Sequence, residues 1–293
     1  MSDTLDQKIP QQPKPAAVNP LANFYRQPKI YIKLPSNGRF YPEGSLDVSE
    51  TGEYAVFAMT ARDELMLKTP DALMNGQSTV EVIKSCVPAI LNPWAMPSID
   101  LDAVLIAIRI ATYGEKLDVS TNCPSCGQSN DYQLDLVAFL GSLNNFEYDN
   151  VVNIGELTVH LRPYNYRETT KIAIKALEQE RIFDIVNNNE MSDEEKIEQF
   201  GVSFLRLTDL TVTIISDAIE VIETPDGKVD DRELISDFIN NAPKEIFSAV
   251  QHRLDVVKEE LELKSHKVTC QNCSHEFTTS VTLDQANFFA VRS

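Results

Sequence analysis

The chain has 293 residues, of which 43% are hydrophobic, and its formal net charge at pH 7 is −18. This length and apolar content suffice for one large or two modest hydrophobic cores. Because the sequence shows neither a signal-peptide pattern nor a run of eighteen apolar residues, we expect neither export nor membrane insertion, and the acidity disfavours binding to nucleic-acid phosphates.

Residues 1–29 carry five prolines among Gln, Lys and Asn, a composition that predicts a flexible arm without a core. The arm either stays disordered without a function or becomes ordered on a neighbouring subunit, and the sequence leaves both possibilities open. An N-terminal α+β region is predicted over 30–115. It begins with strands at 30–34 and 54–59, and a turn at 35–38 follows the first strand.

Helices complete this region. The change of hydrophobic period at Thr60 predicts a short helix over 61–67 that ends before Pro70, and a second helix is expected over 80–87. A third helix, predicted over 101–110, is apolar on nearly every side and should be buried at the centre. Ser98 or Asp100 would cap this helix, and Gly114 would end it.

Two Cys-x-x-Cys pairs lie far apart in the chain, and each is expected at the turn of a β-hairpin. Cys123 and Cys126 belong to a hairpin predicted over 116–137, and Cys270 and Cys273 to one within 263–293. Four thiolates complete a closed tetrahedral zinc site. The two hairpins are therefore predicted to form one split zinc ribbon around a single structural Zn²⁺. Because the sequence shows no export signal, we expect the thiols to stay reduced in the cytoplasm and to bind metal instead of forming disulfides.

Other interpretations of the cysteines remain open at this point. They could be ordinary buried thiols or a redox pair, although a thioredoxin-like pair would stand at the start of a helix after a strand. His275 could replace one sulfur, as in a Cys-x-x-Cys-x-His arrangement. Cys86 lies in an apolar run and is predicted to be a small core residue.

Between the hairpins, residues 138–262 are predicted to form a mainly helical insert, entered and left through the ribbon. We expect a strand at 157–161, helices at about 166–186 and after 192, a hairpin at 219–229, and a last helix over about 243–261. The helix after 192 begins with a capping box and carries one apolar stripe: Ile197, Phe200, Phe204 and Leu207. Three acidic residues lack EF-hand spacing and are expected in a turn and a helix cap: Asp226, Asp230 and Glu233.

Catalytic patterns are missing from the sequence. No GxSxG, HExxH, P-loop or GxGxxG occurs, and the four histidines are scattered at 160, 252, 266 and 275. A zinc ion held by four sulfurs has no open position for water or substrate. We therefore expect no enzymatic activity.

Three motifs in fixed order suggest a family: Lys-Leu-Pro-Ser-Asn-Gly-Arg-Phe-Tyr at 33–41, Met-Thr-Ala-Arg-Asp-Glu with Thr-Pro-Asp-Ala-Leu within 59–73, and the helix at 105–114 leading into Cys-Pro-Ser-Cys-Gly. Over about residues 30–137 the chain resembles the T-even-like baseplate hub proteins of contractile-tailed bacteriophages, and beyond 138 only the general layout is similar. The resemblance implies a non-enzymatic baseplate hub protein that contacts other baseplate or tail proteins. Such a protein is either a virion component or an assembly factor that acts in the host cytoplasm.

The resemblance also implies a contact surface at the first turn, made of Leu34, Pro35, Phe40 and Tyr41. Core packing is the competing interpretation for Phe40, Tyr41 and Trp94. The alternative function is that of a regulatory or nucleic-acid-associated zinc-ribbon protein. It has weak support, because only Lys116, Lys264 and Lys267 lie near the two cysteine pairs.

Overall fold

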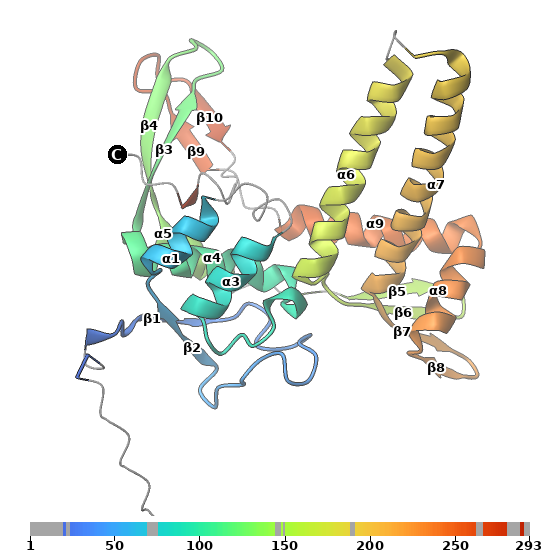
Figure 1. Cartoon of the computed structure of the whole chain (residues 1–293), viewed down its shortest axis with the longest axis horizontal. Helices are drawn as coiled ribbons and strands as arrows, with labels where there is room; N and C mark the ends of the chain where they lie inside the picture. Colours follow the sequence, from blue (N-terminus) through green and yellow to red (C-terminus); the bar gives the residue numbers. More distant parts are fainter. Residues whose placement is uncertain are drawn as a thin grey trace, which may run out of the picture.

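The computed structural model describes residues 20–21, 24–68, 76–143, 148, 150–187, 191–261, 266–279 and 288–289. Figure 1 shows a body of short helices and a two-stranded sheet, from which two β-hairpins project on one side. On the other side lie a second sheet and a long helical hairpin. Helices and antiparallel strands are segregated in this way, which confirms the predicted α+β class.

The N-terminal body begins with strands β1 (Pro28–Lys33) and β2 (Glu53–Phe57), which pair antiparallel. Most of the predicted arm lies outside the described residues, but its last residues do not behave as an arm. Pro28 already belongs to β1, and the Arg26 guanidinium donates a hydrogen bond of 2.6 Å to the Ala58 carbonyl. The predicted boundary at residue 29 is therefore too late.

Helices α1 (Ala61–Leu67), α3 (Gln77–Cys86), α4 (Ser98–Tyr113) and α5 (Leu136–Leu143), with the 3-10 turn η2 (Pro93–Ala95), complete the body. Helix α4 is central, as predicted, because its apolar residues face neighbours on all sides. Cys86 is fully buried in this core, which confirms its predicted place. Helix α5 was not predicted, and it packs on the body through Leu136.

The predicted N-cap of α4 is wrong, whereas Gly114 ends the helix as predicted. The N-cap residue is Pro97, which makes no side-chain cap. Asp100 instead reaches the turn after β1, where its carboxylate accepts hydrogen bonds from the Ser36 N–H at 2.7 Å, the Ser36 hydroxyl at 2.6 Å and the Tyr41 hydroxyl at 3.0 Å. Asp100 is fully buried, so these three donors replace water around the carboxylate and fix the turn on α4.

Asp100 is expected to make stability depend on pH. Burial raises its pKa from 3.8 to about 6, although Ser36 and Tyr41 oppose the rise. A carboxyl with a raised pKa in the folded state stabilises the fold fully below pH 3.8 and loses that contribution as pH rises through about 6. Between pH 4 and 7 we expect the wild type to lose about 2 to 3 kcal/mol relative to Asp100→Asn, in urea denaturation at each pH. A constant difference between the two proteins would contradict this expectation.

Both cysteine hairpins form where they were predicted. Strands β3 (Lys116–Asn122) and β4 (Ser129–Asp135) pair antiparallel in the first, and β9 (His266–Thr269) and β10 (Glu276–Thr279) in the second. The first hairpin is longer and leads directly into α5. In Figure 1 the two hairpins lie side by side.

The insert contains a four-stranded antiparallel sheet in the order β5-β6-β7-β8. Its strands are β5 (Val151–Ile154), β6 (Leu157–Leu161), β7 (Ile219–Thr224) and β8 (Gly227–Val229). The strand at 157–161 and the hairpin at 219–229 were predicted, but β5 and the pairing of β6 with β7 were not. This pairing joins segments about sixty residues apart, which no local pattern reveals.

Four helices belong to the insert: α6 (Tyr166–Asn187), α7 (Asp193–Ala218), α8 (Arg232–Asn241) and α9 (Lys244–Leu261). Helices α6 and α7 form a long antiparallel hairpin, whereas α8 and α9 lie beside the sheet (Figure 1). The capping box of Ser192 and Glu195 is confirmed. The sequence predicted a helix cap near Asp230 and Glu233 but no range for α8. The N-cap is Asp231, whose carboxylate accepts from the N–H groups of Glu233 and Leu234. No described helix is both long and apolar enough to span a membrane.

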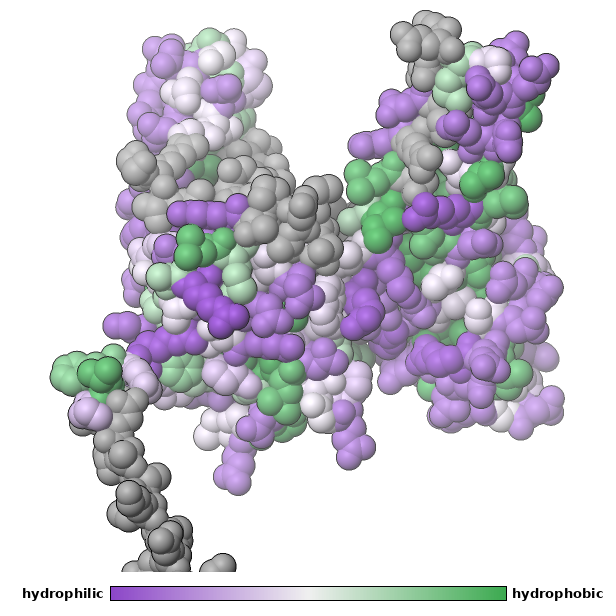
Figure 2. Space-filling model, in the orientation of Figure 1, coloured by the Kyte–Doolittle hydropathy of each residue, from purple (hydrophilic) through white to green (hydrophobic). Residues whose placement is uncertain are grey.

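The apolar stripe of α7 is not buried in this chain. Ile197 is 73% exposed, Phe200 40% and Phe204 53%, and Phe200 stacks on Phe204 with ring centres 6.0 Å apart. Figure 2 shows apolar side chains at the surface over the α6–α7 hairpin. A periodic apolar face predicts burial, but no described residue packs over the N-terminal part of this stripe.

Residues 164–166 of the insert contact residues 96–98 of the body through backbone hydrogen bonds. The Ser98 N–H donates to the Tyr164 carbonyl at 2.6 Å, and the Tyr166 N–H donates to the Met96 carbonyl at 2.9 Å. Beside this junction the Arg162 guanidinium binds the Glu168 carboxylate through two hydrogen bonds of 3.0 and 2.6 Å. The Glu168 side chain is only 7% exposed, so the pair is an internal part of the junction.

Two aromatic residues near the C-terminus pack into the N-terminal core. Phe288 and Phe289 are both buried there, and the Arg109 guanidinium lies 5.5 Å from the Phe288 ring centre. Burial also lowers the pKa of Arg109. From the sequence, residues 263–293 were predicted to belong to the ribbon alone. The packing of Phe288 and Phe289 against the N-terminal body was not predicted. The apolar alternation of the second hairpin continues in the sequence at Val281 and Leu283 and predicts a longer strand, but these two residues lie outside the described residues.

Candidate metal centre

Each cysteine pair lies in a tight loop between two strands, and the two loops share one pattern of backbone hydrogen bonds. In both, the first cysteine exchanges bonds with residues four and five positions later. The N–H to carbonyl distances are 2.9 Å for Cys123 to Gln128 and Gly127 to Cys123, 2.9 Å for Cys270 to His275, and 3.0 Å for Ser274 to Cys270. The loops are therefore local copies of each other, and each presents two sulfurs.

The residue after each second cysteine has a left-handed backbone. Gly127 has φ 71° and Ser274 has φ 59°. Glycine adopts this conformation without strain, whereas serine has a Cβ that disfavours it. The common conformation at both positions supports a shared loop geometry despite the different residues.

The four sulfur atoms converge from the two hairpins and lie within 4.8 Å of one another. The Sγ atoms of Cys123 and Cys273 are 3.7 Å apart, as are those of Cys126 and Cys270. A disulfide bond would measure about 2.05 Å, whereas a tetrahedron with metal–sulfur bonds of about 2.3 Å has edges of about 3.8 Å. The observed spacing fits the tetrahedron, so the four side chains could hold one metal ion.

Hydrogen bonds between the hairpins support this arrangement. The buried Asn130 side chain donates to the Gln128 carbonyl at 2.8 Å and accepts from the Gln271 N–H of the other hairpin, also at 2.8 Å. The Tyr132 hydroxyl donates to the Thr269 carbonyl at 3.3 Å. Cys123 and Cys270 are buried, whereas Cys126 and Cys273 are exposed, so one edge of the site faces water.

The pKa values of the second pair move in opposite directions. Backbone N–H groups, that of Cys273 first, lower the pKa of Cys270 to about 6. The His275 backbone N–H lowers the pKa of Cys273, but partial desolvation and the hydrogen bonds with the three neighbouring sulfurs outweigh it and raise that pKa to about 12. One thiol therefore ionises easily and the next does not. A dication would remove this conflict by attracting all four thiolates.

Residues 27–290 match the family described as T4 bacteriophage base plate protein, which is most of the chain. The chain belongs to this family. Its match extends beyond the motifs at 30–137 and includes the insert and both cysteine hairpins. No curated protein and no solved structure matches the chain. Family membership identifies a structural protein of the phage baseplate, which is a part of the tail.

In this baseplate protein the residues predicted to contact partners are largely packed inside. Leu34 and Pro35 are buried, and Phe40 and Tyr41 are half-buried. The Phe40 ring makes an edge contact with Tyr148, with ring centres 5.6 Å apart. Packing explains these residues without a partner, and their proposed contact role stays a prediction.

Other aromatic and histidine candidates also have partners within the chain. Trp94 stacks on Tyr166 with ring centres 5.4 Å apart. The His160 Nε2 lies 3.1 Å from a Glu223 carboxylate oxygen in the insert sheet. His275 is exposed and stacks on Phe277. Among the described side chains, the four cysteines are the one group of three or more that could hold a metal, and His275 does not join them.

Proposed function

We propose that this protein is a non-enzymatic structural or assembly protein of the baseplate hub, in which one structural Zn²⁺ joins the two cysteine hairpins. The observation that carries the proposal is the baseplate family match over residues 27–290. The assignment to the hub rests on the sequence motifs within 33–114. Contacts with other baseplate or tail proteins follow from such a role.

The chemistry of the cysteine cluster supports zinc in a structural position. Four thiolates satisfy the usual coordination of zinc and leave no open site for substrate. The cluster links segments 144 or more residues apart in sequence, since Cys126 and Cys270 are in contact. Zinc would then act as a clasp between the start and the end of the insert. The domain division at 116–137, 138–262 and 263–293 stays part of this proposal.

Surface composition supports function through protein contacts. Val202, Phe204 and Leu205 on α7 are each more than half exposed. Clustered apolar side chains at a surface are typical of interaction sites. The net charge of −18 disfavours nucleic acid, because phosphate binding needs clustered Lys and Arg.

Purified phage particles and a deletion mutant test the proposal. We expect quantitative mass spectrometry to detect the protein in tails at a fixed copy number if it is a structural component. If it is an assembly factor, we expect it to be absent from particles while its deletion stops tail assembly. Normal tail assembly without the protein would refute both forms of the proposal. Tight, salt-sensitive DNA binding at about 50 mM salt would favour the alternative zinc-ribbon function instead.

A further inference from the structure

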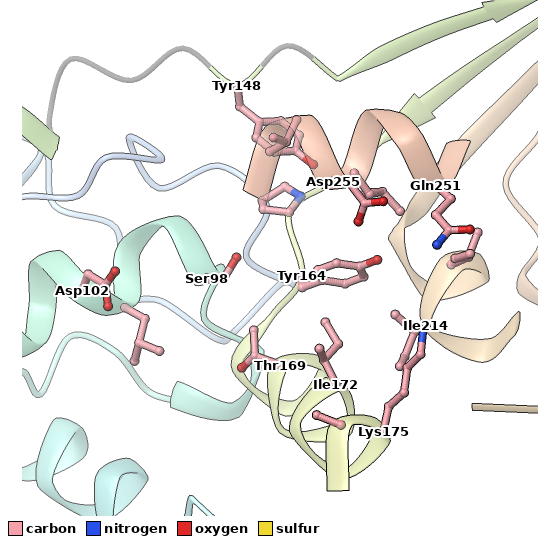
Figure 3. Close-up of a pocket in the computed structure, with 16 residues that line it drawn as sticks. Ser98, Asp102, Tyr148, Tyr164, Thr169, Ile172, Lys175, Ile214, Gln251 and Asp255 are labelled. Atoms are coloured by element: carbon pink, nitrogen blue, oxygen red, sulfur yellow. The ribbon is translucent and has the colours of Figure 1, made fainter. Parts of the chain in front are cut away.

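A cavity of about 590 Å³ lies where the N-terminal body meets the insert. Figure 3 shows its walls, which come from α4, α6, α7, α9 and the segment around Tyr164. This volume is within the range of small-ligand pockets, about 300–1,000 Å³. Most of the lining is apolar: Leu101, Ile172, Ala176, Ile214, Ile215, Leu254 and Val257.

One carboxylate in this lining, that of Asp102, has no hydrogen-bond or ion-pair partner among the residues that the structure describes. Asp102 projects from α4, and burial alone raises its pKa to about 6, so it is still ionised at pH 7. Among the described residues, none donates a hydrogen bond or forms an ion pair with it. Asp100, one half-turn earlier on the same helix, has three donors. The fold thus gives hydrogen-bond donors to the buried carboxylate of Asp100, whereas the half-buried carboxylate of Asp102 lines the cavity without a donor among the described residues.

Other charged groups of the cavity do not neutralise Asp102. Lys175 lines the same cavity but forms no ion pair with Asp102, and Asp255 adds a second carboxylate. In Figure 3 Asp102 lies at one end of the lining, and Lys175 and Asp255 lie at the other. The end near Asp102 is therefore anionic and is bordered by the hydrocarbon side chain of Leu101. A half-buried ionised carboxylate at an apolar wall, with no donor among the described residues, favours a cationic partner.

We propose that this cavity binds a primary ammonium group on an aliphatic stem, with the ammonium at Asp102 and the stem against the apolar wall. A lysine side chain of another protein and a free aliphatic amine share this chemistry. Both ligands would bury methylene groups and neutralise the carboxylate at the same time. The proposal concerns this cavity alone and does not depend on the baseplate function.

The test uses the full-length, zinc-loaded protein with labelled isoleucine methyl groups, because Ile172, Ile214 and Ile215 line the cavity. The probes are n-pentylammonium and Nα-acetyl-lysine N-methylamide, with 1-pentanol and pentanoate as uncharged and anionic comparisons. We expect both amines to shift these methyl signals and to bind at least about tenfold more tightly than 1-pentanol. Tighter binding of the lysine amide would indicate a protein side chain as the natural ligand, and tighter binding of pentylammonium a free amine.

Variants locate the ammonium group. Asp102→Asn keeps the shape of the side chain and should lower the affinity for both amines at least about tenfold. Asp209→Asn on the exposed face of α7 should leave both affinities unchanged. The proposal is overturned if neither amine shifts the methyl signals, if 1-pentanol binds as well as pentylammonium, or if Asp102→Asn binds both amines like the wild type. The comparison of amine with alcohol needs only the wild-type protein, so it holds even if the variant does not fold.

Discussion

Replacement of Cys270 by serine is expected to release the zinc ion and to lower the free energy of unfolding by about 4 kcal/mol, when free zinc exceeds the dissociation constant a thousandfold. Serine does not ionise at neutral pH, so the site would keep three thiolates of the four that converge within 4.8 Å. Metal content by mass spectrometry and urea denaturation at fixed free zinc measure the two effects.

The structure also predicts which residues lose stability when zinc is released. Without zinc, the described residues of the second hairpin keep a few hydrogen bonds to the first, such as those from Gln271 to Asn130 and from Tyr132 to Thr269. The insert has its own core and a separate junction with the body. Amide exchange should therefore accelerate over 266–279, while β6 and β7 stay protected.

Cys86→Ala is the matched control, because Cys86 is a buried thiol outside the cluster. We expect this variant to lose some stability through the core while it retains one zinc ion per chain. Full metal content and an unchanged melting profile in Cys270→Ser would argue against the zinc clasp.

Replacement of Glu168 by alanine is expected to lower the free energy of unfolding by about 3 kcal/mol. The change leaves the Arg162 guanidinium, only 20% exposed, without its counter-charge. It also removes the acceptor for the Asn165 N–H, 2.9 Å away. Because Asn165 and Tyr166 pair with the body at the junction, amide exchange should accelerate at Ser98 and Tyr166. Urea denaturation gives the size of the effect.

Glu180→Ala tests whether this effect is specific to the junction. Glu180 lies on the same helix, α6, and is exposed, so we expect its removal to change stability by less than about 0.5 kcal/mol. Equal effects of the two substitutions would show that Arg162 and Glu168 contribute no more than a surface charge does.

Residues with a local signal could be predicted from the sequence. The two Cys-x-x-Cys loops follow from spacing and flanking alternation, and the structure brings all four sulfurs together. The capping box at Ser192 depends on residues three apart, and it forms as expected. The contacts that form each cysteine loop and the capping box lie within one turn or one hairpin, so short stretches of sequence contain the necessary information. The meeting of the four sulfurs instead joins two hairpins that are 144 or more residues apart.

Residues whose partners are distant in sequence could not be predicted in this way. Asp100 has the spacing of a helix cap, but its partners lie 64 and 59 residues earlier at Ser36 and Tyr41. The stripe at Ile197 and Phe204 has the period of a buried face, yet nothing described in this chain covers it. Periodicity shows which residues share a face but not whether a neighbour packs against it.

The sequence by itself determined the two cysteine loops of the candidate metal site, the central helix α4 and the baseplate resemblance, because each depends on residue types at short, fixed spacing. Only the tertiary structure decided that β6 pairs with β7, that Phe288 returns to the N-terminal core and that Asp102 lines a cavity. These features arise where separate elements meet. Their energies depend on burial and on partners that the local sequence does not specify.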